Sequence, residues 1–133
     1  QRANLPFYAL GDGATVRIVG GRAYEPDALV APLPKPAAGA LEVPNPIIVV
    51  EVLSPSPASV KRDLTTKLRG YEKVASIQHY LVVDPVERTV FGFHRNGEAL
   101  TAGDELAEGT LRLDPPGLEV PVAEMLVPDP ASS

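Results

Sequence analysis

Ile47–Leu53, with the sequence IIVVEVL, is the stretch that decides the fold, and Ser54–Pro57, SPSP, follows it directly. A short run of almost uniformly apolar, β-branched residues is typical of a central strand that is buried on both faces. Glu51 interrupts this run, and a carboxylate in a buried strand is costly unless it is paired or bound to a metal. We therefore predict a central strand that carries one functional or ion-paired glutamate.

The segments after the central strand predict a parallel pair of strands. Apolar residues recur at spacings of three and four through Ser59–Val74, which indicates a helix, and His79–Val83 has the composition of the next strand. Because a helix joins them, the central strand and His79–Val83 are expected to be parallel, with a right-handed crossover. Thr89–His94 is predicted to be the antiparallel neighbour of His79–Val83, and Pro121–Leu126 is predicted to form a final short helix.

The segments before the central strand predict two more strands. Thr15–Gly20 is rich in β-branched residues and ends at a glycine turn, and Tyr24–Ala31 is predicted to be a strand that pairs antiparallel with the central one. The proline-rich stretch Pro32–Pro46 is predicted to be a long loop between them. The fold class that follows is α/β, a mixed sheet with a crossover helix after the central strand.

Composition limits the classes of protein that this chain can belong to. Its 133 residues, of which 44% are hydrophobic, suit a single domain over residues 1–133. There is no cysteine, which excludes a disulfide framework and a thiolate metal site. No apolar stretch approaches the roughly 18 residues of a membrane span, and no secretory signal is visible, so we expect a cytoplasmic protein without a membrane partner.

Charge is distributed unevenly along the chain. The net charge of −5 argues against a protein that coats nucleic acid by bulk electrostatics. Five of the chain's basic residues nevertheless fall in the predicted helix and its end, at Lys61, Arg62, Lys67, Arg69 and Lys73, whereas the region after Gly97 is acidic. This pattern allows a local contact with phosphate groups.

Three charged residues are expected to converge under this topology. Asp27 lies on the strand that neighbours the central one, Glu51 lies near the end of the central strand, and Lys67 lies on the helix that follows. Two carboxylates from adjacent strands can hold a hard cation such as Mg²⁺, which lowers the pKa of its bound water and stabilises charge on a phosphoryl oxygen. An ammonium group beside them can stabilise the developing negative charge. These groups suffice for hydrolysis of a phosphodiester.

Several motifs together resemble the Uma-two family, which is assigned to the PD-(D/E)xK nuclease superfamily. They are Pro26-Asp27, the stretch VVEVLSPS over Val49–Ser56, the positions Asp63, Lys67 and Tyr71, and the stretch HYLVVD over His79–Asp84. The resemblance runs from about Ala23 to the end of the chain. It implies the restriction-endonuclease-like fold, a metal-dependent nuclease site with Mg²⁺ or Mn²⁺, DNA as the substrate, and a possible homodimer.

The resemblance also implies roles for individual residues. Asp27 and Glu51 would be catalytic metal ligands, and the carbonyl of Val52 a third ligand. The superfamily pattern has a lysine two residues after the glutamate, where this chain has Leu53, and Lys67 on the following helix would substitute for it. Family members usually carry an N-terminal helix with an acidic residue and a histidine, which this sequence is expected to lack.

Other interpretations of the same residues stay open. A Glu51–Lys67 ion pair would satisfy Glu51 without catalysis, and the chain would then be a catalytically inactive binding or assembly module of the same fold. The same ligands also suit a hydrolase of small phosphate compounds. Tyr71 is predicted to be a core residue. His79 and His94 have no partner at metal-ligand spacing, so both are predicted to be structural or exposed.

Overall fold

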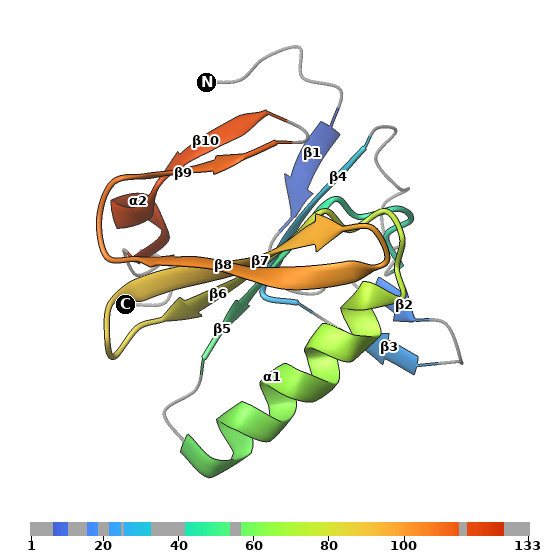
Figure 1. The fold of residues 1–133 in the computed structure, drawn as a ribbon. Helices are drawn as coiled ribbons and strands as arrows, with labels where there is room; N and C mark the ends of the chain where they lie inside the picture. The colour runs from blue at the N-terminus through green and yellow to red at the C-terminus, as the bar shows by residue number, and fades with distance from the viewer. Residues whose placement is uncertain are drawn as a thin grey trace.

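The computed structural model describes residues 7–10, 16–18, 22–24, 26–32, 42–53, 57–114 and 117–126. A six-stranded sheet forms the centre of the molecule, with the order β1-β4-β5-β6-β7-β8 (Figure 1). Its strands are β1 (Phe7–Leu10), β4 (Ala28–Pro32), β5 (Ile48–Val52), β6 (His79–Asp84), β7 (Thr89–Asn96) and β8 (Ala99–Leu106). Two smaller pairs are β2 (Val16–Ile18) with β3 (Arg22–Tyr24) and β9 (Thr110–Leu113) with β10 (Leu118–Pro121). The helices are α1 (Pro57–Glu72) and α2 (Val122–Leu126).

The strand directions agree with those that the sequence predicts. β5 runs parallel to β6, with Val50 opposite Leu81, and α1 lies between these two strands in chain order. β4 and β7 are antiparallel neighbours of β5 and β6, respectively. The predicted short helix at the end of the chain is present as α2. The prediction of a mixed α/β sheet around the central strand is therefore confirmed.

The predicted strand Tyr24–Ala31 is two separate elements. Tyr24 ends β3 and pairs with Val16, whereas β4 begins at Ala28 and joins the main sheet. Pro26 lies between the two and has no N–H to donate to a strand ladder, so a continuous strand is broken there. The break leaves Asp27 directly in front of β4, which matters for the candidate site.

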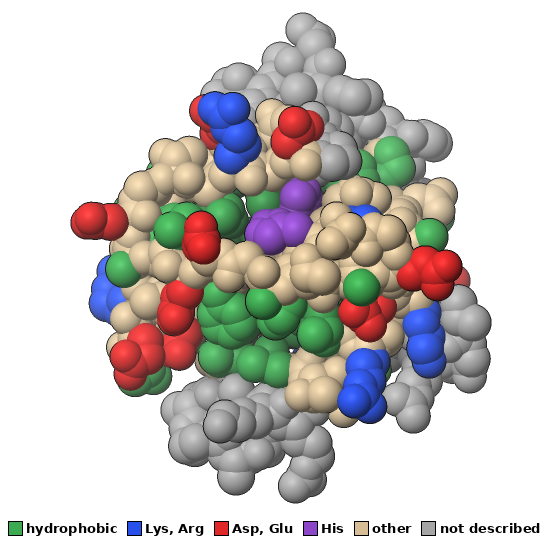
Figure 2. Space-filling view, viewed as in Figure 1, with side chains coloured by type: hydrophobic (Ala, Val, Ile, Leu, Met, Phe, Trp, Pro, Cys, Tyr) green, Lys and Arg blue, Asp and Glu red, His purple; other side chains and the backbone are tan. Residues whose placement is uncertain are grey.

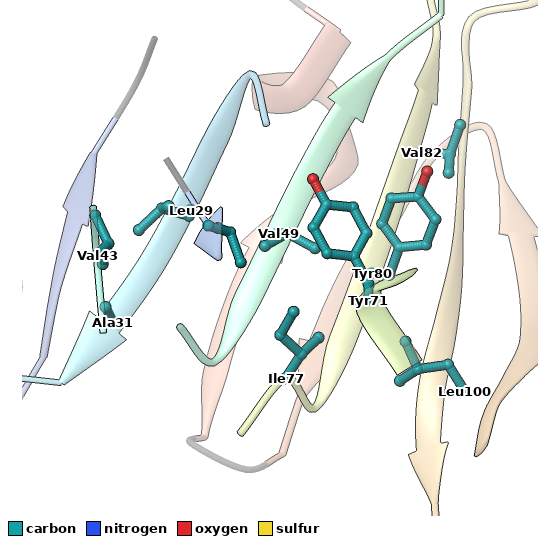
Figure 3. Close-up of a cluster of buried hydrophobic side chains, with 10 residues drawn as sticks. Leu29, Ala31, Val43, Val49, Tyr71, Ile77, Tyr80, Val82 and Leu100 are labelled. Carbon is teal, nitrogen blue, oxygen red and sulfur yellow. The ribbon is translucent and has the colours of Figure 1, made fainter. Parts of the chain in front are cut away.

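The two faces of the sheet carry two separate cores. Val49 faces α1, and the core on this side also contains Leu29, Ala31, Val43, Tyr71, Ile77, Tyr80, Val82 and Leu100 (Figure 3). Ile48 and Val50 face the opposite side, where Leu81, Val83 and Val90 pack with residues of the β9–β10 pair and α2. Figure 1 shows α1 on one side of the sheet and the β9–β10 pair with α2 on the other. Both faces of β5 are therefore covered, as its apolar sequence predicts.

Arg95 on β7 fastens the C-terminal end of α1 to the sheet. Its guanidinium group donates hydrogen bonds to the carbonyl oxygens of Ile77 (2.9 Å), Val74 (2.9 Å), Glu72 (3.2 Å) and Glu98 (3.2 Å). The last carbonyl groups of a helix have no partner within the helix, so they need donors from elsewhere. Arg95 supplies these donors and thereby fixes the position of α1 over the sheet.

His79 and His94 are hydrogen-bonded to each other. They lie opposite each other on β6 and β7, and their Nδ1 atoms are 2.8 Å apart, so one ring donates and the other accepts. His79 is buried and His94 is half-buried. The ring of His94 also lies against Gly103 of β8, where a Cβ atom would come within 2.7 Å of it. Figure 2 shows histidine side chains in a hollow on this face of the molecule, among apolar groups. Each histidine is thus the other's partner, which spacing along the sequence does not indicate.

The histidine pair makes the stability of the protein depend on pH. Burial lowers the pKa of His94, and the nearby charge of Asp104 opposes this shift only in part. The unfolded chain, with a histidine pKa of about 6.5, therefore binds a proton at His94 more readily than the folded chain does. Stability is full above that pKa and falls as the pH drops toward the folded pKa of His94. We expect urea unfolding between about pH 8 and pH 5 to show this loss.

The variant His94→Gln isolates this contribution from other titrating groups. It removes the titrating ring and keeps a polar side chain of similar reach. As the pH falls below about 6.5, we expect wild type to lose more unfolding free energy than the variant, because only wild type has the titrating ring. A difference that stays constant across this range would contradict the assignment to His94.

Candidate functional site

Glu51 is a buried carboxylate near the end of the central strand. The residue is 6% exposed and shares the α1 face of the sheet with Val49, two residues earlier on β5. Burial raises the pKa of Glu51, the charge of Lys67 and the hydrogen bonds from Tyr71 and Lys67 lower it, and the nearby charge of Asp27 raises it further. The carboxylate is therefore held in an apolar setting by two specific partners.

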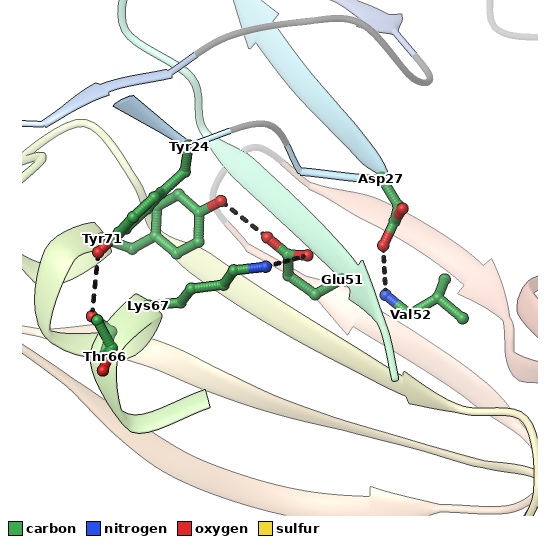
Figure 4. Close-up of polar contacts among 7 residues, drawn as sticks. All are labelled: Tyr24, Asp27, Glu51, Val52, Thr66, Lys67 and Tyr71. Atoms are coloured by element: carbon green, nitrogen blue, oxygen red, sulfur yellow. Dashed lines mark hydrogen bonds and ion pairs between the residues drawn. The ribbon is translucent and has the colours of Figure 1, made fainter. Parts of the chain in front are cut away.

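Both partners of Glu51 come from α1. Lys67 Nζ lies 3.2 Å from Oε1 of Glu51, and the Tyr71 hydroxyl donates a hydrogen bond of 2.9 Å to Oε2 (Figure 4). Residues four apart lie on the same face of a helix, so one face of α1 presents both groups to the sheet. The Lys67 side chain is 24% exposed, so its ammonium group connects the buried carboxylate with solvent.

Asp27 lies across the strand pair from Glu51. The last paired residues of β4 and β5 are Ala28 and Val50, and Asp27 directly precedes Ala28. Its charge lies near enough to Glu51 to raise the pKa of that carboxyl group.

Backbone contacts hold Asp27 in this place. Its amide N–H donates to the carbonyl oxygen of Val50 at 2.9 Å. The amide N–H of Val52 in turn donates to Oδ2 of Asp27 at 2.7 Å (Figure 4). The side chain of Asp27 thereby extends the strand ladder beyond the last backbone pair and has a defined orientation.

The structure brings together the residues that the sequence singled out. Asp27, Glu51 and Lys67 form one cluster at the end of β5, and Val52 adjoins it through its backbone amide. The side chain of Asp63 lies outside the described residues. Tyr71 is a core residue, as predicted, but it is also a direct partner of Glu51, which the sequence analysis missed. The signal that was available was its spacing, four residues after Lys67 on a predicted helix.

The cluster fits a small, hard divalent cation. Within the described part of the chain, no group of three or more His, Cys, Asp or Glu side chains could hold a metal ion. Mg²⁺ does not need such a group, because it commonly binds through one or two carboxylates and keeps several waters. When ionised, Asp27 and Glu51 carry two negative charges against the single positive charge of Lys67, so the cluster has one uncompensated negative charge. This charge and the oxygen ligands suit Mg²⁺ or Mn²⁺.

A comparison with protein families gives one match that covers nearly the whole chain. The model described as "Uma2: Putative restriction endonuclease" matches residues 1–123. The chain belongs to the Uma2 family. This membership agrees with the resemblance that the sequence motifs indicate. It places the chain among nuclease-like proteins.

The fold of this Uma2 protein is shared with a solved structure. One match is to the crystal structure of "a putative nuclease belonging to DUF820" from Anabaena variabilis, with a TM-score of 0.61 and 18% sequence identity. The alignment covers 91% of this chain and 68% of the other. At this identity the likeness concerns the fold, which confirms the predicted nuclease-like α/β class. No curated protein matches the chain significantly.

Among the described residues, no helix is long and apolar enough to cross a membrane.

Proposed function

We propose that this chain is a Mg²⁺- or Mn²⁺-dependent DNA endonuclease domain, with Asp27, Glu51 and Lys67 as its catalytic residues. The observation that carries the proposal is the environment of Glu51. It is a buried carboxylate at the end of the central strand, with an ammonium group at 3.2 Å and a second carboxylate across the strand pair. Membership of a family described as restriction endonucleases supports this assignment.

Asp27, Glu51 and the carbonyl group of Val52 would hold the cation. When bound, the cation supplies a water of lowered pKa and stabilises charge on the phosphoryl oxygen. Asp27 keeps its orientation through the Val52 amide, and Glu51 keeps its orientation through α1. Lys67 places a positive charge beside Glu51, where it orients the attacking water and stabilises the charge that develops on the phosphate.

The substrate class in this proposal is DNA. Arg69 and Lys73 follow Lys67 along α1 and its end, and both are exposed, so they can contact phosphate groups along a nucleic acid backbone. The proposed setting is the cytoplasm, and two copies of the chain acting as a homodimer would cut both strands of a duplex.

Calorimetric titration of Mn²⁺ tests the cation site without requiring the right substrate. We expect wild-type protein to bind about one Mn²⁺ per chain, as a single pair of carboxylates implies, and the double variant Asp27→Ala/Glu51→Ala to lose this binding. The matched control is Glu105→Ala/Glu119→Ala, which removes two carboxylates from β8 and β10 and should bind as wild type does. Cleavage of plasmid DNA by wild type and not by the double variant would complete the test.

Equal, weak binding by wild type and the double variant would contradict the proposal. The Glu51–Lys67 ion pair favours that alternative, because it already satisfies the buried carboxylate without a cation. The chain would then be a catalytically inactive module of the same fold. Saturable binding with cleavage of short phosphodiesters only would point to a hydrolase of small phosphate compounds instead.

A further inference from the structure

Tyr71 occupies a position from which it controls the geometry of Glu51. The two carboxylate oxygens of Glu51 are divided between two donors, with Oε1 near Lys67 and Oε2 near the Tyr71 hydroxyl. A carboxylate that is bonded at one oxygen only can rotate about its last side-chain bond. Donors at both oxygens fix the plane of the group and therefore the direction in which its free lone pairs point.

The two donors differ in rigidity. The Lys67 side chain is long and 24% exposed, whereas Tyr71 is fully buried. The ring of Tyr71 packs edge-on against Tyr24 at 5.3 Å between centroids and lies 5.1 Å from the ring of Tyr80. These contacts hold the Tyr71 ring and therefore the position of its hydroxyl group. Tyr71 thus restricts the orientation of Glu51 more tightly than Lys67 does.

The hydroxyl of Tyr71 acts as a hydrogen-bond donor toward Glu51. It donates a bond of 2.9 Å to Oε2, so one lone pair of that oxygen is directed at Tyr71 and the remaining lone pairs of the carboxylate stay available for a cation.

We propose that Tyr71 is a positioning residue that sets the cation affinity of Glu51, whereas Lys67 serves the chemical step. This inference rests on the proposed function, because it assumes that Glu51 holds a divalent cation. Groups that orient a metal ligand typically change metal affinity about 10–100-fold when they are removed. Lys67 carries a positive charge beside the same ligand, so its removal relieves repulsion toward a cation, and this gain offsets part of the loss of its hydrogen bond to Oε1.

Mn²⁺ titration of three variants by calorimetry tests this division of roles. Tyr71→Phe removes one oxygen atom and keeps the ring packing, and we expect it to weaken Mn²⁺ binding about 10-fold or more. Tyr24→Phe is the matched control, because its hydroxyl bonds to the Thr66 carbonyl of α1 at 3.4 Å and not to Glu51. Tyr24→Phe is expected to bind Mn²⁺ within about threefold of wild type, and Lys67→Met is expected to lose less affinity than Tyr71→Phe. Thermal melting checks that each variant is folded.

Each other outcome overturns a specific statement. If Tyr71→Phe melts lower but binds Mn²⁺ as wild type does, its hydroxyl has only a structural role. If Lys67→Met loses affinity as much as Tyr71→Phe, any partner of Glu51 serves equally and the assignment to Tyr71 is wrong. If wild type binds no better than Asp27→Ala/Glu51→Ala, the proposed function fails together with this inference, which separates that failure from the first two.

Discussion

Replacing Lys67 with methionine should lower metal-stimulated DNA cleavage about 10²–10³-fold, the usual effect of removing one charge-stabilising donor from a catalytic site. Methionine has a similar length and fills the space beside α1, so the variant is expected to fold. The physical reason for the loss is that the ammonium group next to Glu51 at 3.2 Å no longer stabilises charge at the phosphate. Initial rates on supercoiled plasmid at saturating Mn²⁺ are the measurement.

The conditions and the control of this experiment follow from the structure. The charge of Lys67 is the largest influence that opposes the burial-raised pKa of Glu51, so the comparison belongs at about pH 8, because a high pH favours the ionised form of Glu51 in both proteins. Arg112→Met also removes a positive charge, at an exposed position of β9 on the other side of the sheet, and should leave the rate nearly unchanged. Equal rates for Lys67→Met and wild type would exclude Lys67 from the chemical step.

Replacing Arg95 with methionine should lower the free energy of unfolding by about 2–4 kcal/mol. The four carbonyl oxygens that accept hydrogen bonds from this guanidinium group would lose a charged donor in a half-buried place. One of them belongs to Glu72, the last residue of α1, whose carbonyl group has no partner within the helix, and another belongs to Val74 just beyond it. Urea unfolding followed by circular dichroism measures the loss.

Arg112→Met is the matched control for Arg95→Met. Arg112 forms an ion pair with Glu119, but both side chains are largely exposed, so this variant should lose less than about 1 kcal/mol. Arg95→Lys should recover only part of the stability, because an ammonium group cannot reach several carbonyls in the planar arrangement of a guanidinium. A loss below about 1 kcal/mol for Arg95→Met would contradict the role assigned to it in fixing α1.

Much of the sheet's centre could be predicted because its sequence pattern has one physical explanation. The uniform apolar run around Glu51 is typical of a strand covered on both faces, and β5 lies between α1 and the β9–β10 pair as such a strand requires. The helical spacing before His79 then required parallel strands. The candidate cluster followed from this topology, because it depends on which strands are neighbours and hardly on side-chain detail.

The edges of the sheet could not be predicted in the same way. β8 has one buried residue, Leu100, and is otherwise exposed or half-exposed, so it lacks the alternation that marks a strand. The bond between His79 and His94 depends on the register of β6 and β7, which sequence does not specify. The sequence predicts Tyr71 as an ordinary core residue because its ring packs in the core. The bond from its hydroxyl to Glu51 is visible only in the structure.

Because the Val52 amide donates a hydrogen bond to Asp27, the candidate site forms only when β4 and β5 pair in the correct register. A slip of β4 by one residue against β5 would move Asp27 away from the Val52 amide and from Glu51. A misaligned chain would therefore have no place for a cation, while a correctly aligned one would gain stability from it. In such a protein a bound cation would stabilise only the chain with the native strand register, and would thereby disfavour misaligned folding.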